Sequence, residues 1–185
     1  MENNESIGNE NKSKIDKKEL LSWIKYIGAA ILISLFLTRF VILNAYIPTG
    51  SMENTIMPGD RVFASRVHYL FTEPKRGDII VFKNPDNEKE NYVKRVIGLP
   101  GETVKIKDGE VYINDVKLEE SYIKEEMRVE EEKVYQVPED SYFVMGDNRN
   151  NSNDSRRWHT TKYVKKSKIL GKVAFRYFPW PKWLW

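Results

Sequence analysis

The 185-residue sequence contains no cysteine. This absence excludes a disulfide scaffold, a cysteine nucleophile and a cysteine-ligated zinc site. Histidine is also scarce, because only His68 and His159 are present. A Ser/His/Asp triad or a two-histidine metal site remains conceivable, but neither histidine has a suggestive setting and no third ligand stands at a useful spacing. We therefore expect no metal and no cofactor.

Neither sign of charge dominates. The chain has 30 Lys+Arg against 27 Asp+Glu, and the two signs are interspersed along the sequence. A nucleic-acid-binding protein usually gathers its cations on one face or in one stretch. The charges therefore indicate a solvated surface, and we expect no nucleic-acid partner.

A single long apolar run lies near the N-terminus. Residues 1–20 are polar and predict a disordered tail. Residues 21–43 are apolar on all sides, whereas a core helix would keep a polar stripe. The uncharged part is shorter than the roughly 20 residues that a membrane span needs. Because Lys25 and Arg39 near its two ends can snorkel to the headgroups, we predict a transmembrane helix over 21–43 that contacts the lipid bilayer.

The flanking residues predict how this helix is oriented. A cleaved signal peptide needs small residues at −1 and −3, and Leu43 occupies the −3 position before Ala45, so we expect the anchor to be retained. The positive-inside rule places the N-terminus in the cytoplasm and residues 44–185 outside the cell membrane. The lysines that decide this are at positions 12, 14, 17, 18 and 25.

The remainder, 44–185, shows no long helical period and no internal repeat. Short β-branched and aromatic runs alternate with turn signals, among them Asp108-Gly109 between two alternating runs. We predict a mostly β domain with a small peripheral hairpin region at about 107–135. The aromatic C-terminus is compatible with a foot on the membrane or with rings that close the β core. The expected strands are 78–82, 92–97, 103–106, 110–113, 116–118, 142–145 and 169–175.

Ser51 stands in a segment with possible chemistry, directly after the apolar run. Pro48 favours an extended chain, and Gly50 lets the backbone approach another group closely. In an extended chain, the side chain of Thr49 shares a face with that of Ser51. A polar turn after a membrane span explains the same residues without catalysis.

Adjacent cations interrupt the apolar strand at 92–97. Strand side chains alternate, so Lys94 and Arg95 point to opposite faces, and one of them is expected to face inward. Burial disfavours the charged form of lysine, and a neutral lysine can serve as a general base for a serine. The alternative is an edge strand on which both cations guard against aggregation.

A third segment, 146–156, has no apolar residue and suits either a generic loop or one that supports an active site.

In order and spacing, these segments resemble the bacterial type I signal peptidases over essentially the whole chain, in the shorter Gram-positive form. The matching segments are Ile47–Met52, Arg76–Phe82, Tyr92–Glu102 and the run from Gly146 to Arg156.

The resemblance implies a role for each matching residue. Ser51 is the expected nucleophile, Lys94 its general base, and the Ser51 N–H with the Thr49 hydroxyl the oxyanion hole. Ser152 is expected to orient the lysine. The pockets for small residues at −1 and −3 of the substrate correspond to Ile47, Ile56 and Val93, and the structural ion pairs to Arg95, Asp147, Asp154 and Arg156.

Two departures from the family pattern are visible. Asn54 and Ile56 replace the common Pro and Leu, and Asn150 replaces a common Asp, which puts one ion pair in doubt.

The expected function is removal of signal peptides from exported preproteins through an acyl-enzyme. A specialised maturation peptidase and a non-catalytic membrane-tethered β binding module are the alternatives. A self-cleaving repressor of the LexA type is disfavoured, because a membrane span stands where its DNA-binding domain belongs.

Overall fold

The computed structural model describes residues 17–184 and divides into two compact units, with the boundary after Leu37. The first unit contains helix α1, Lys17–Phe36. The helix thus begins four residues before the predicted start at residue 21, and the rest of the predicted N-terminal tail lies outside the described residues. A π-helical turn, Leu37–Val41, continues it and ends two residues before the predicted end of the span at residue 43, and strand β1 begins at Ile42.

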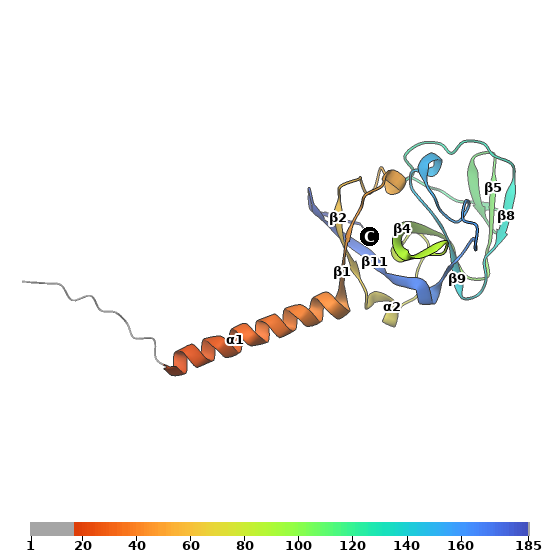
Figure 1. Ribbon diagram of the computed structural model, residues 1–185. Coiled ribbons are helices and arrows are strands. Elements are labelled where there is room, and N and C mark those ends of the chain that lie inside the picture. Colours follow the sequence, from red (N-terminus) through yellow and green to blue (C-terminus); the bar gives the residue numbers. More distant parts are fainter. Residues whose placement is uncertain (1–16, 185) are drawn as a thin grey trace, which may run out of the picture. The chain divides into compact units, whose positions relative to one another are not determined.

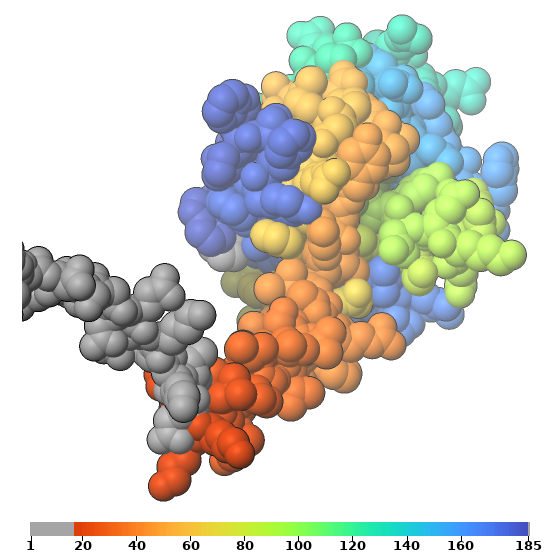
Figure 2. Space-filling view, turned by 60° about the vertical axis from the view of Figure 1, so that its left-hand side comes forward, coloured from red at the N-terminus to blue at the C-terminus, as the bar shows by residue number. Residues whose placement is uncertain are grey.

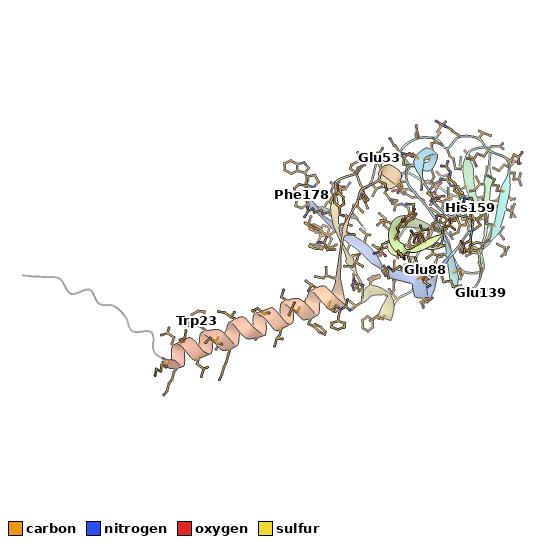
Figure 3. All side chains as sticks on the ribbon, in the orientation of Figure 1. Trp23, Glu53, Glu88, Glu139, His159 and Phe178 are labelled. Carbon is orange, nitrogen blue, oxygen red and sulfur yellow. The ribbon has the colours of Figure 1, made fainter. Side chains whose placement is uncertain are left out.

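Helix α1 has the properties of a membrane span. Its side chains project on all sides, and none is buried (Figure 3). The segment Lys17–Val41 has 25 residues and a mean hydropathy of 2.0, and no other helix within residues 17–184 is long and apolar enough to cross a bilayer. At about 1.5 Å per residue it is roughly 37 Å long, which exceeds the hydrocarbon core of about 30 Å.

The second unit is mostly β, as the sequence predicts (Figure 1). Its larger sheet has eight strands in the order β1-β2-β11-β3-β4-β9-β10, with β12 paired to β11. The strands of this sheet are β1 (Ile42–Tyr46), β2 (Arg61–Ser65), β3 (Ile79–Asn84), β4 (Asn87–Gly98), β9 (Ser141–Met145), β10 (Val164–Lys165), β11 (Ile169–Phe178) and β12 (Lys182–Trp183).

The smaller sheet has the order β7-β6-β5-β8 and accounts for the predicted peripheral region. Asp108 and Gly109 join β5 to β6, and both have positive φ angles. These angles suit the tight hairpin that the Asp-Gly pair predicts. Residues 118–132 form no strand. The strands are β5 (Thr103–Lys107), β6 (Glu110–Ile113), β7 (Val116–Lys117) and β8 (Lys133–Gln136).

The apolar run on β3 is buried on both faces. Ile79 and Val81 pack in one hydrophobic cluster, and Ile80 and Phe82 pack in another with Trp158. A strand covered on both sides has a continuous rather than an alternating apolar sequence. This double cover fixes β3 and its neighbour β4 as the rigid centre of the domain. The β unit also contains four short helical turns: η2 (Gly50–Met52), α2 (His68–Phe71), η3 (Arg149–Asn151) and η4 (Lys166–Lys168).

The C-terminal aromatic segment pairs with the sheet but does not close its core. Strand β11 runs three residues beyond the predicted end at 175, and β12 folds back on it. Trp180 and Trp183 are 76% and 60% exposed, and Phe178 also projects outward (Figure 3). The core-closing alternative is therefore wrong for these rings, and a membrane role for them remains a prediction.

Candidate active site

Ser51 lies in the 3₁₀ turn η2, between β1 and β2. Thr49 before it is extended, with φ −120° and ψ 155°, and Met52 after it is almost fully buried. Two backbone hydrogen bonds tighten the turn, from Glu53 N to Gly50 O (3.1 Å) and from Ile56 N to Met52 O (2.8 Å). The serine is 9% exposed and is held in one position at the edge of a cavity.

Lys94 reaches this serine from β4. Its Nζ lies 2.7 Å from the Ser51 Oγ and 3.0 Å from the carbonyl oxygen of Val93. The lysine is 4% exposed. Burial lowers the pKa of Lys94 to about 8, although the negative charges of Asp154 and Asp147 act in the opposite direction. A fraction of the amines is therefore unprotonated near neutral pH, as a general base requires.

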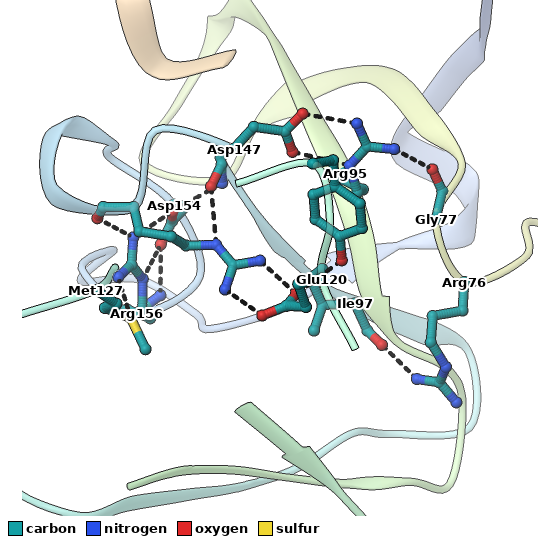
Figure 4. A network of polar contacts seen from close by, with 12 residues as sticks. Arg76, Gly77, Arg95, Ile97, Glu120, Met127, Asp147, Asp154 and Arg156 are labelled. Carbon is teal, nitrogen blue, oxygen red and sulfur yellow. Dashed lines mark hydrogen bonds and ion pairs between the residues drawn. The ribbon is translucent and has the colours of Figure 1, made fainter. Parts of the chain in front are cut away.

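Arg95 points away from the serine, as strand alternation predicts. Its guanidinium forms a bidentate pair with Asp147 at 2.8 and 2.6 Å and donates to the carbonyl oxygen of Gly77 at 2.8 Å (Figure 4). The Tyr122 ring lies 4.0 Å from the guanidinium carbon. Thr55 donates to the Asp147 carboxylate at 2.5 Å. This buried pair ties β4 to the loop at 146–156 and to the chain just after Ser51.

The loop at 146–156 carries a second buried pair. Arg156 binds Asp154 through its Nε and a terminal nitrogen at 2.9 and 2.8 Å. Burial opposes ionisation of Asp154, but the hydrogen bonds and charge of Arg156 outweigh it and hold the pKa of that carboxyl below its usual value. The loop is thus an ordered support rather than a generic loop.

The same loop contacts the nucleophile turn through Asn148. The Asn148 backbone N–H donates to the Ser51 carbonyl oxygen at 3.1 Å, and its side-chain amide donates to the Gly50 carbonyl oxygen at 3.0 Å. Gly146 lies so close that an added Cβ would overlap both the Ser51 carbonyl oxygen and the Ser152 hydroxyl. Only glycine permits this approach of the two backbones.

Ser152 lies beside the site without the expected contact. Its hydroxyl is buried and forms no hydrogen bond with Lys94, whose amine instead contacts Ser51 and Val93. The orienting role that the resemblance implies for Ser152 is therefore not visible in this arrangement of side chains.

A cavity of about 510 Å³ opens onto the serine and the lysine. Ile47, Thr49 and Val93 line it, as expected for a substrate pocket and an oxyanion hole. Figure 2 shows the orange segment that contains Ser51 beside the yellow-green start of β4 on one face. Ile56 is fully buried in the hydrophobic cluster that contains Ile47 and is not part of the cavity lining. It supports the pocket from within the core.

Sequence reasoning missed a segment that supports the site from the other side. The stretch 119–133 belongs to the peripheral hairpin region predicted at about 107–135, but the side chain of Glu120 (labelled in Figure 4) is only 8% exposed and forms a bidentate pair with Arg149. Asn54 donates to the carbonyl oxygens of Tyr122 and Ile123 at 3.0 and 3.3 Å. No local sequence pattern announces these contacts, because the partners are between 29 and 69 positions apart.

Asn150, which replaces the common Asp in the loop at 146–156, forms hydrogen bonds with residues of the 119–133 stretch. Its amide donates to the Glu125 carboxylate and to the Glu126 carbonyl oxygen, both at 3.0 Å, and its side-chain oxygen accepts from the Arg128 N–H at 2.9 Å. These three hydrogen bonds, one of them to a carboxylate, therefore connect the loop to the 119–133 stretch although position 150 carries no acidic side chain. Within residues 17–184, no cluster of His, Asp and Glu side chains is suited to a metal ion.

Comparisons with known proteins agree with this geometry. The family described as "Signal peptidase, peptidase S26" matches residues 20–180. A signal peptidase I of Leptolyngbya laminosa is 42% identical, over 86% of this chain and 80% of its own length. A probable signal peptidase I-2 of Synechocystis is 36% identical over 96% and 84% of the two chains, and a signal peptidase I of Bacillus licheniformis is 38% identical over 92% and 95%.

Proposed function

The chain belongs to the signal peptidase family, peptidase S26, and on this basis we propose that it is a membrane-bound serine endopeptidase that removes signal peptides from exported preproteins. The observation that carries the proposal is the 2.7 Å separation between the Ser51 Oγ and the Nζ of a buried lysine whose pKa is lowered to about 8. An exposed lysine, with its pKa near 10.4, would be protonated and unable to accept the serine proton.

The first step uses Lys94 as the base. The neutral amine takes the proton of the Ser51 hydroxyl while the Oγ attacks the carbonyl carbon of the −1 residue of the substrate. The negative charge that develops on the carbonyl oxygen is stabilised by the Ser51 backbone N–H and the Thr49 hydroxyl. The protonated Lys94 then gives its proton to the leaving amine, and the C–N bond breaks to leave an acyl-enzyme.

The second step regenerates the enzyme. Lys94 takes a proton from water, and the resulting hydroxide attacks the acyl carbon. The ester bond to the Ser51 Oγ then breaks, the protonated Lys94 returns its proton to that oxygen, and the signal peptide leaves with a free carboxylate. After each transfer the lysine is briefly a buried cation, and the carbonyl oxygen of Val93 at 3.0 Å then accepts a hydrogen bond from it. The Ser152 hydroxyl, which is buried beside Gly146, is available to bind the same amine after a side-chain rotation.

The cavity suits an extended peptide. The substrate chain lies between the segment before Ser51 and the start of β4, with alternate side chains directed into the wall formed by Ile47 and Val93. Both wall residues are apolar, and Ile47 is held from behind by buried Ile56. The wall leaves room for small residues at −1 and −3.

The protein is a single-pass membrane protein, with α1 as its span. We further propose that its N-terminus is cytoplasmic and its β unit lies outside the membrane, because the lysines of the N-terminal segment favour the cytoplasmic side. This orientation brings the β unit to the side on which exported preproteins emerge.

Incubation of the purified full chain with a preprotein tests the function directly. We expect a single cut after a small residue at −1, mapped by sequencing the mature N-terminus, and no cut with the Ser51→Ala variant. Equal cleavage by the two proteins would show that the observed protease is a contaminant and would contradict the proposal.

A further inference from the structure

The cavity carries a carboxylate at some distance from the dyad. Glu90 lies on β4, four residues before Lys94, and its side chain is exposed. Of the described residues that line the cavity, Glu90 is the only Asp or Glu, and Lys94 is the only Lys or Arg. Because Lys94 works as a base in its neutral form, a bound peptide meets one negative charge in the cavity and no standing positive charge to balance it.

The Glu90 carboxylate is available to a ligand. It accepts a hydrogen bond from the side-chain amide of Asn87 at 2.9 Å, and within residues 17–184 it has no cationic partner. Glu88, two residues earlier on the same strand, is instead paired with Lys168 at 2.6 Å. A carboxylate can accept several hydrogen bonds, so Glu90 keeps acceptor capacity for a cationic side chain that enters the cavity.

The backbone edge beside Glu90 is also open. Strand β4 pairs with β3 from Asn87 to Arg95, but it pairs with β9 on its opposite edge only from Arg95 onward. In the part of the chain that the structure describes, no strand covers this opposite edge over residues 87–94. An uncovered strand edge can bind an extended peptide as an additional strand, with specificity from alternate side chains.

The proposed function fixes the register of such a peptide. The bond to be cut lies at Ser51 and Lys94, and the −1 side chain is directed into the wall formed by Ile47 and Val93. The −1 residue therefore lies opposite Val93, and the peptide runs parallel to β4. Both chains advance about 3.3 Å per residue, so the −4 residue lies opposite Glu90. Side chains that lie opposite each other project from the same face, which brings the −4 side chain to the carboxylate.

We propose that Glu90 is a specificity-determining residue, which favours Lys or Arg over Asp or Glu at position −4 of the signal peptide. The proposal rests on the peptidase function proposed above and describes which preproteins that site prefers. A cationic side chain is attracted by the Glu90 carboxylate, whereas an acidic one is repelled, and repulsion is an effective way to reject a competitor. Because Glu90 is exposed, the preference is modest and weakens as salt is added.

Soluble peptides that differ at one position test the assignment. They share one cleavage sequence and carry Lys, Gln or Glu at −4, and a second set carries the same three residues at −5. The full chain in detergent cleaves each peptide, and kcat/KM is measured. Glu90→Gln removes the charge but keeps the size of the side chain and its capacity to accept from Asn87, and Glu90→Lys reverses the charge.

Glu88→Gln is the matched control. Glu88 is an exposed acidic residue on the same strand (labelled in Figure 3), but it does not line the cavity. We expect the unsubstituted enzyme and Glu88→Gln to prefer Lys over Glu at −4 by roughly fivefold in kcat/KM at low salt. Glu90→Gln should cleave the three peptides equally well, and Glu90→Lys should reverse their order. The −5 set should show no such dependence, because that side chain projects from the opposite face.

A preference that survives Glu90→Gln, or that Glu88→Gln removes to the same extent, would overturn the assignment, since another group or the general field of the surface would then be responsible. A preference at −5 in place of −4 would overturn the register. Equal cleavage of all peptides by the unsubstituted enzyme would leave the peptidase intact and refute only the role of Glu90. Failure to cleave any peptide or preprotein would contradict the peptidase function, and this proposal with it.

Discussion

The Nζ of Lys94 lies 2.7 Å from the Oγ of Ser51, although 43 positions separate the two residues in the sequence. The turn η2 supplies the serine, and β4, which pairs with the doubly covered β3, supplies the lysine, so their relative position is set by the packing of the domain. The neighbouring residue Arg95 is also buried, but it serves a different purpose. Its guanidinium is a permanent cation and forms an ion pair with Asp147.

Lys94→Arg is expected to abolish cleavage, with a loss comparable to that of Ser51→Ala. Arginine remains protonated and cannot accept the serine proton, although it keeps the positive charge and much of the side-chain length. The measurement is kcat/KM on a preprotein or a signal-peptide substrate, with circular dichroism to verify the fold. An active Lys94→Arg enzyme would refute the dyad.

The pH dependence of cleavage should follow the Lys94 amine. Because burial lowers the pKa of Lys94 to about 8, kcat/KM should rise with pH and level off above about 8. The measurement is the apparent pKa of the acidic limb in a plot of kcat/KM against pH, because kcat/KM reports the ionisation of the free enzyme. An acidic limb near pH 10 would mean that the base is an ordinary exposed lysine, contrary to the structure.

The lowered pKa also makes a prediction about stability. Below about pH 8 both the folded and the unfolded chain hold a protonated lysine, and folding carries the full cost of burying the cation. Between about 8 and 10.5 the unfolded chain binds more protons, so the free energy of unfolding rises with pH. Lys94→Met should therefore stabilise the fold at pH 7, by at most about 3 kcal/mol, and the gain should shrink toward pH 10.5. Thermal unfolding of both proteins at pH 7 and pH 10 in the same detergent measures it, and a gain independent of pH would assign the effect to packing alone.

Thr49→Val tests the oxyanion hole. The substitution keeps the shape of the side chain at the cavity wall but removes the hydroxyl, so kcat should fall by roughly 10²- to 10³-fold with little change in KM. Thr49→Ser is the matched control and should retain most of the activity. Equal losses in the two variants would indicate that the methyl group, rather than the hydroxyl, is what the site requires.

The buried pair between Glu120 and Arg149 should stabilise the loop behind the dyad. Glu120→Gln leaves the Arg149 guanidinium, whose side chain is 1% exposed, without its charge partner, and should lower the free energy of unfolding by about 3 kcal/mol. Glu130→Gln is the matched control, because its pair with Lys133 is exposed and should change stability by less than about 0.5 kcal/mol. Chemical unfolding of the two variants compares them, and equal small effects would show that the 119–133 stretch is as peripheral as its sequence suggests.

Much of the fold could be predicted from local patterns. The apolar run near the N-terminus gave a single helix, and the hairpin signal at Asp108-Gly109 stands where β5 turns into β6. The adjacent cations on the strand at 92–97 point in opposite directions, as the alternation of strand side chains dictates. The resemblance added the pairing of Ser51 with Lys94, which no spacing rule contains.

Other features could not be predicted, because they depend on which distant segments meet. Glu120 lies in a highly charged stretch, which predicts a solvated side chain, but the fold buries it beside Arg149. Ile56 was expected at the cavity surface, but the turn after Ser51 directs it into the core. The Ser152 hydroxyl lies near the site without reaching the lysine.

The sequence by itself determined the elements: an apolar helix of membrane-spanning length, short strands joined by tight turns, and an inward-facing lysine next to an arginine. These follow from short-range steric and hydrophobic preferences, which act between residues a few positions apart. Only the tertiary structure decided that this lysine loses water and meets the serine, because desolvation is a property of everything packed around the amine.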